Sequence, residues 1–192
     1  QYYRSQNATV SGGFLTITAK QENFGGANYT SARLRTLNMG DWKYGRFEMR
    51  AKLPTGQGMW PAFWLLPSDS VYGVWAASGE IDVMELVGHQ PDRIHGTLHY
   101  GNTSPGNVSS GSSYTLPSGT FNDAFHVFAL EWDEFEMRWY IDGNLYATQN
   151  SWWSGGGAYP APFDQRFHML LNLAVGGNWP GPPNGSTQFP QE

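Results

Sequence analysis

The stretch Tyr44-Gly45-Arg46-Phe47-Glu48-Met49-Arg50-Ala51-Lys52-Leu53 alternates charged and apolar side chains almost without a break. Successive side chains of a β-strand point to opposite faces, so the apolar residues from Phe47 to Leu53 would share one face. The charged residues from Arg46 to Lys52 would share the other face. The pattern predicts a strand that buries one face in a core and exposes the other.

Similar alternation recurs on both sides of this stretch. Further strands are predicted at Phe14 to Ala19, Ile94 to Tyr100, Phe135 to Ile141, Leu145 to Thr148 and Phe167 to Val175. In these strands Leu15 and Ile17 are expected to face the core, and Phe135 is expected to share a buried face with Ile141. Asp142-Gly143 predicts a tight hairpin turn.

No window of the chain has the periodicity of an amphipathic helix. Many antiparallel strands joined by Gly- and Pro-containing turns are typical of sandwiches and jelly rolls. We therefore expect an all-β fold, a two-sheet antiparallel β-sandwich of the jelly-roll type, with an open substrate cleft on its concave sheet. The 192 residues suit one domain, 1–192.

Composition narrows the possible partners. The net charge is −5 and no run of Lys or Arg occurs, which argues against nucleic-acid and anionic-membrane partners. The absence of cysteine rules out disulfides and thiolate metal sites. Aromatic residues make up 16% of the chain and include nine Trp, more than a core of this size needs. Flat indole rings stack well on sugar rings, so the composition points to a carbohydrate ligand.

The segment Gly79 to Leu86 contains three acids, at positions 80, 82 and 85. In a regular strand Glu80 and Asp82 would share one face and Glu85 would point the opposite way. A β-bulge at Val83-Met84 would bring Glu85 to the same face. Two carboxyl groups about 5–5.5 Å apart are what a retaining glycosidase needs, and repulsion between them separates their pKa values.

Two other interpretations of this segment were open. It could be an acidic strand edge that faces solvent, or a metal site formed with His95 and His99. The spacing of the two histidines is not helical and no close-set ligand triad is evident, so no metal ligand is assigned.

The run from Tyr72 to Glu85 resembles the active-site signature of the laminarinase branch of glycoside hydrolase family 16. Further matching segments are Tyr44 to Arg50, Met59 to Pro67, His95 to Gly101 and Asn172 to Gly181. The resemblance implies a secreted, monomeric enzyme that cuts β-1,3-glucan internally with retention and requires no cofactor. Agar- and carrageenan-degrading relatives share the longer acid spacing, so spacing alone does not settle the substrate.

By this resemblance Glu80 is the nucleophile, Asp82 assists it and Glu85 is the general acid/base; the residues alone do not order the two Glu. The residues implied in substrate binding are Glu48, Arg50, Trp60, Trp64, Trp75, His99, Asn172 and Trp179. His99 is expected beside the acid/base. The predicted cleft strands carry few basic groups, mainly Arg46 and Arg50, which favours a neutral glucan over a sulfated galactan.

The chain also departs from the family. The usual aromatic-Asp-Glu-Phe opening and the closing strand of the Asp-Tyr-Val-Arg-Val type are absent. In the family those segments often carry ligands for a structural calcium, so calcium is possible here but cannot be assigned. The alternatives that remain are hydrolysis of mixed-linkage β-1,3-1,4-glucan or of a galactan, and a non-catalytic β-glucan-binding module. The three acids favour an enzyme, because binding modules of this kind lose them.

Overall fold

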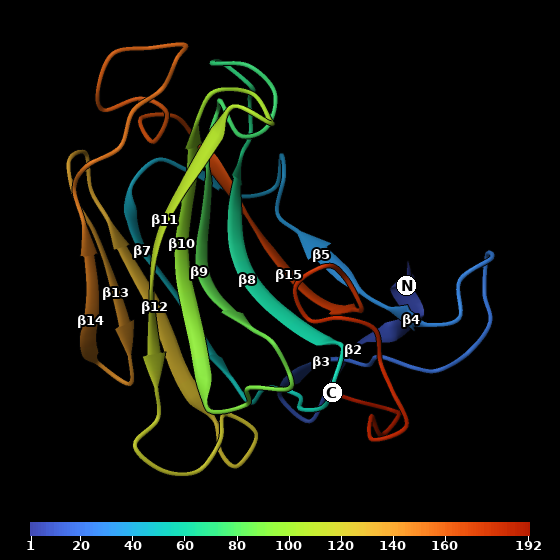
Figure 1. The fold of residues 1–192 in the computed structure, drawn as a ribbon. Coiled ribbons are helices and arrows are strands. Elements are labelled where there is room, and N and C mark those ends of the chain that lie inside the picture. The colour runs from blue at the N-terminus through green and yellow to red at the C-terminus, as the bar shows by residue number, and fades with distance from the viewer.

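The computed structural model describes residues 1–192 and shows two antiparallel sheets packed face to face (Figure 1). The larger sheet is curved and has the order β11-β10-β9-β8-β15-β5, with β6 also paired to β15. Its strands are β5 (Arg33–Arg35), β6 (Asp41–Trp42), β8 (Met59–Pro67), β9 (Glu80–Leu86), β10 (Arg93–Gly101), β11 (Asn107–Thr115) and β15 (Phe167–Val175). The all-β sandwich predicted from the sequence is confirmed.

The second sheet, called the outer sheet below, has the order β14-β13-β12-β7. Its strands are β7 (Gly45–Ala51), β12 (His126–Trp132), β13 (Met137–Ile141) and β14 (Asn144–Gln149). Two short pairs lie outside both sheets: β1 (Tyr2–Tyr3) with β4 (Thr30–Ser31), and β2 (Ala8–Ser11) with β3 (Phe14–Ile17). The one helical segment is a 3-10 turn, η1 (Ser5–Asn7), and no helix is long and apolar enough to cross a membrane.

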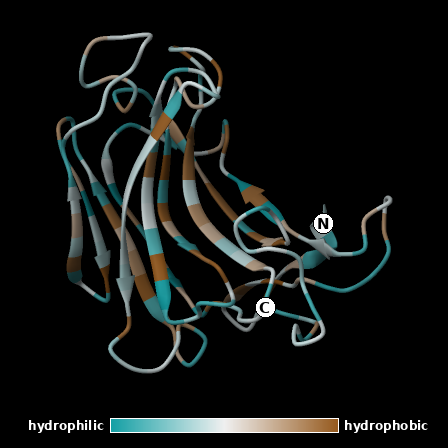
Figure 2. Cartoon of the chain, viewed as in Figure 1, coloured by the Kyte–Doolittle hydropathy of each residue, from teal (hydrophilic) through white to brown (hydrophobic).

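The core lies between the two sheets, and hydrophobic segments follow the strands while most loops are hydrophilic or neutral (Figure 2). Three tryptophans, Trp132, Trp139 and Trp152, belong to this core rather than to a binding surface. Trp132 and Trp139 are fully buried, and each indole N–H donates to a backbone oxygen, that of Phe163 and that of Asp82. The second bond ties the outer sheet to the acidic strand β9.

The predicted hairpin between β13 and β14 is confirmed. Asp142 and Gly143 both have positive φ, 48° and 79°, as a two-residue turn between right-twisted strands requires. The strand before it begins later than predicted, because the Asp133 side chain accepts the backbone N–H groups of Phe135 and Glu136 and forms a turn there. Phe135 is therefore 52% exposed instead of buried.

The prediction for the first strand is also partly wrong. Strand β3 pairs only with β2, and this hairpin does not extend either main sheet. Without a sheet to cover it, Leu15 is 45% exposed, whereas Ile17 is partly buried and packs against a small apolar cluster around Met59.

Candidate active site

Strand β9 lies inside the large sheet, between β8 and β10. Along β8, Phe63 lies opposite Met84 and the next residue, Trp64, lies opposite Asp82, so Val83 has no partner. The register with β10 shifts at the same place. The predicted bulge at Val83-Met84 is confirmed. One extra residue of β9 is left unpaired there, and the strand pairing on either side of it is intact.

The bulge places Glu80, Asp82 and Glu85 on the same face of the large sheet. Each glutamate there accepts a hydrogen bond from an indole N–H. Trp75 Nε1 donates to Glu80 Oε2 at 2.8 Å, and Trp60 Nε1 donates to Glu85 Oε1 at 3.0 Å. These bonds orient both carboxyl groups, because each indole is itself held by a neighbouring segment of the fold.

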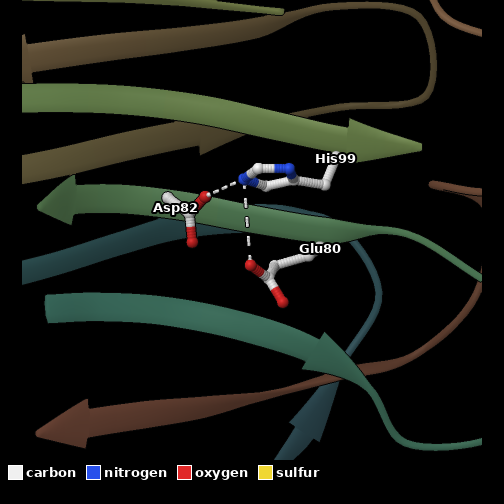
Figure 3. Close-up of side chains that lie close together, drawn as sticks. All are labelled: Glu80, Asp82 and His99. Carbon is white, nitrogen blue, oxygen red and sulfur yellow. Dashed lines mark ion pairs between the residues drawn. The ribbon is translucent and has the colours of Figure 1, made fainter. Parts of the chain in front are cut away.

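His99 reaches the carboxyl groups from β10, and Figure 3 shows its side chain and those of Glu80 and Asp82 pointing toward one another. His99 Nε2 lies 3.2 Å from Asp82 Oδ2 and 3.9 Å from Glu80 Oε1. The register sets His99 opposite Glu80, whereas His95 is the residue opposite Glu85. His99 thus contacts Glu80 and Asp82 and not Glu85, beside which it was expected. His95, which was not among the predicted substrate-binding residues, is the cross-strand neighbour of Glu85.

Burial dominates the electrostatics of the three acids. It raises the pKa of Glu80 to about 8, with further repulsion from Asp82 and partial compensation by His99. Burial and repulsion from Glu85 raise the pKa of Asp82 well above its usual range. Burial also raises the pKa of Glu85, against the effect of its indole hydrogen bond. The three groups therefore share protons at neutral pH, which supplies both an acid and a base.

The same cluster offers a possible metal site. One ligand atom each from Glu80, Asp82 and His99 lie within 4.8 Å of one another. Nitrogen and carboxylate oxygen donors suit Zn²⁺ and similar ions. A metal site and a cluster that shares protons respond differently to chelation, because only the metal site loses a group when the ion is removed.

Aromatic side chains surround the acids, as predicted. Trp64 Nε1 donates to Asn172 Oδ1 at 2.8 Å, which joins β8 to β15. The Trp60 and Trp179 rings are nearly perpendicular, with centroids 5.7 Å apart. Trp75 and Trp179 are 45% and 41% exposed, so their faces remain available to a sugar ring.

Two predicted substrate-binding residues lie elsewhere. Glu48 and Arg50 are on β7 of the outer sheet, with side chains on the face away from the core. There Glu48 bonds to Arg46 at 2.7 Å and Arg50 covers the ring of Phe125. The expectation that Glu48 and Arg50 contact sugar is therefore corrected. The alternation of charged and apolar residues shows that the two side chains point away from the core, but it does not show which of the two sheets contains the strand.

The sequence analysis missed several residues near the cleft. Arg33 and Arg35 are on β5, a strand of three residues that is too short to show alternation. Trp153 is 45% exposed, and its ring lies against Gly101 at the end of β10. A side chain at position 101 would come within 3.1 Å of this ring. Its neighbour Trp152 is buried in the core, so residue type alone could not distinguish the two.

Comparison with known proteins agrees with this geometry. Residues 2–188 match the family described as glycosyl hydrolases family 16. The chain is 45% identical to glucan endo-1,3-beta-glucosidase A1 of Niallia circulans, over 97% of this chain and 30% of that protein. It is 44% identical to a beta-glucanase of Rhodothermus marinus, over 94% of this chain and 66% of that protein.

Solved structures show the same fold. The laminarinase catalytic domain from Thermotoga maritima MSB8 superposes with a TM-score of 0.85 at 40% identity, over 98% of this chain and 77% of that chain. The chain therefore spans less than two thirds of the two curated relatives named above but most of a solved catalytic domain. From the match over nearly its whole length, the chain belongs to glycosyl hydrolases family 16.

Proposed function

We propose that the chain cuts β-1,3-glucan internally, with retention of anomeric configuration, by double displacement. The observation that carries the proposal is the bulge in β9, which gives Glu80 and Glu85 a common face although their spacing in a regular strand would separate them. Relatives named as glucan endo-1,3-beta-glucosidase and laminarinase support the choice of bond.

The reactive state has Glu80 ionised and Glu85 protonated, and because the pKa of Glu80 is raised to about 8, only part of the enzyme is in this state at neutral pH. In the first step the ionised carboxylate of Glu80 attacks the anomeric carbon while protonated Glu85 gives its proton to the departing glycosidic oxygen. This leaves a glycosyl ester on Glu80 and an ionised Glu85. In the second step Glu85 removes a proton from water, the water oxygen attacks the anomeric carbon, and the ester bond to Glu80 breaks. His99 contacts Glu80 and Asp82 and favours the ionised form of Glu80, and Asp82 assists by holding a proton, since its own negative charge would oppose that form.

The surroundings suit a neutral polymer. Trp60, Trp64, Trp75 and Trp179 surround the acids, and stacking on each aromatic face is worth on the order of 1 kcal/mol without any charge on the sugar. The reaction needs only a proton and a water, so we propose that it requires no cofactor. A polysaccharide is too large to be taken up intact, so we propose that the enzyme acts outside the cell. The cleft is formed by one chain, which suits action as a monomer.

The test is release of reducing ends from laminarin, lichenan and agarose, measured side by side with solution viscosity. We expect laminarin to be cut fastest, with an early fall in viscosity and a β-anomer as the first product by NMR. Faster cleavage of agarose would refute the assignment of the bond but not the mechanism. Binding of laminarin without cleavage of any substrate would instead identify a recognition module.

Chelation separates the proton-sharing cluster from a metal site. Dialysis against EDTA should leave the rate unchanged, because the proposed steps use no metal. A loss of activity that added Zn²⁺ restores would show that the reaction needs a metal ion, for which Glu80, Asp82 and His99 are the candidate ligands.

A further inference from the structure

A cavity of about 450 Å³ opens beside the catalytic carboxyl groups, on the β5 side of the large sheet. Its lining includes Tyr3, Arg33, Arg35, Trp75, Gly79 and His168, and it is called the arginine pocket below. Trp75 also donates to Glu80, and Gly79 directly precedes it, so the pocket is continuous with the catalytic site. A group bound in the pocket could therefore be attached to a sugar chain held in the cleft.

The two guanidinium groups of the pocket have no carboxylate partner within 4.0 Å. The Arg33 guanidinium lies over the ring of Trp64, 4.5 Å from its centroid, and so faces the cleft floor. By contrast, Arg46 and Arg138 on the outer sheet are paired with glutamates. Both unpaired arginines lie on one strand of three residues, in a chain whose net charge is −5.

The other titratable groups of the pocket leave this positive charge largely uncompensated. Asp41 on β6 lies opposite His168 in the sheet but does not line the pocket. Burial and both arginines keep the pKa of His168 below its usual value despite Asp41, so the imidazole is neutral at pH 7. Burial raises the pKa of Tyr3, whose hydroxyl therefore stays protonated and able to donate. The lining of the pocket thus carries two guanidinium groups and no carboxylate.

We propose that the arginine pocket binds an anionic substituent, a sulfate or a carboxylate, carried by a sugar unit next to the cleavage point. Planar guanidinium groups match such oxyanions with paired hydrogen bonds, and an oxyanion would also relieve the repulsion between Arg33 and Arg35. The inference rests on the proposed glucanase function and extends its substrates to acidic and sulfated glucans. It also replaces the sequence-based view of the cleft charge, which relied on Arg46 and Arg50 of the outer sheet.

The experiment compares laminarin with partly sulfated and partly carboxymethylated laminarin of the same chain length. Arg35→Gln removes one guanidinium that does not cover Trp64, and Arg46→Gln is the matched control on the outer sheet. We expect Arg35→Gln to raise KM for the modified substrates about tenfold, equivalent to ~1.4 kcal/mol, a typical loss for a charged hydrogen bond. KM for unmodified laminarin and all values for Arg46→Gln should stay within about twofold.

An equal rise of KM on all three substrates would overturn the proposal, since Arg35 would then bind neutral hydroxyls. A response to only one modified substrate identifies that oxyanion as the ligand. Calorimetric binding of the same polymers to Glu85→Gln keeps the test independent of turnover. If no substrate is cut but the modified polymers bind more tightly than laminarin, the glucanase proposal fails and the pocket proposal stands.

Discussion

The two sheets each carry a polar face turned away from the core, and the two faces treat charge in opposite ways. On the outer sheet Glu131 accepts hydrogen bonds from Tyr140, Arg138 and Arg46, and these hydrogen bonds lower its pKa. On the large sheet Glu80 and its neighbours are buried against tryptophan, and their pKa values are raised. Ion pairs that are exposed to solvent contribute little to the free energy of unfolding. Acids that are removed from solvent reduce that free energy, but their shifted pKa values suit them to acid–base chemistry.

The largest expected effect tests the large sheet. Glu80→Gln and Glu85→Gln should each lower kcat on laminarin at least about a thousandfold, because each removes a group that bonds or transfers a proton in the transition state. Circular dichroism should show an unchanged fold. Normal turnover in either variant would end the assignment.

Azide sharpens the roles of the two glutamates. In Glu80→Ala, azide should restore activity and give a product of inverted configuration, because it fills the place of the nucleophile. The same inverted product from Glu85→Ala would exchange the two roles.

The next effect concerns stability against pH. The pKa of Glu80 is raised in the folded protein, so its contribution is fully present below its unfolded pKa and is lost as pH rises to about 8. Glu80→Gln should thus be more stable than the unsubstituted chain at pH 9, by on the order of 3 kcal/mol, and the difference should vanish below about pH 4. Urea unfolding at several pH values measures this.

Glu131→Gln provides the opposite case on the outer sheet. The folded pKa of Glu131 is lowered, so its stabilising contribution is present above the unfolded pKa and is lost as pH falls through the folded pKa. The variant should be slightly less stable at pH 7 and equal to the unsubstituted chain in acid. The same sign of pH dependence for both variants would contradict the contrast between the sheets.

A smaller effect is expected at the aromatic floor. Trp64→Ala removes a stacking face and the bond to Asn172, and should raise KM for laminarin about five- to tenfold. Phe135→Ala, which removes an exposed aromatic outside the cleft, should leave KM unchanged. Equal effects of the two changes would show that Trp64 acts through folding rather than through the substrate.

The smallest effect is expected at Glu48 and Arg50, which were predicted to bind substrate but lie on the outer sheet. Glu48→Gln and Arg50→Gln should keep kcat and KM within about twofold, as for other exposed surface positions. A large rise in KM for either variant would show that glucan also contacts the outer face.

The sequence predicted more of the chemistry than of the surroundings. Glu80 and Glu85 are an odd number of residues apart, so in a regular strand they would point to opposite faces. A bulge was the local distortion that could give them a common face, and the structure has it. The alternation of charged and apolar residues in β7 was equally clear. A strand of either sheet would show the same pattern, however, so Glu48 and Arg50 were assigned to the wrong surface.

The remaining errors depend on contacts that no local pattern encodes. Phe135 leaves its strand because the Asp133 side chain captures two backbone N–H groups. Arg33 and Arg35 reach the cleft only because β5 pairs with β15, more than a hundred positions later in the chain.

Both proposed catalytic glutamates belong to one strand that is hydrogen-bonded along both edges, so the ladder of β9 with β8 and β10 sets their spacing. The loop of residues 68–79 has a different task. It carries Trp75, whose indole N–H donates to Glu80, and its Ala77 accepts a hydrogen bond from Ser154. A loop remodelled for a new polymer would therefore leave the two acids in register but must keep Trp75 in place to orient the Glu80 carboxyl group.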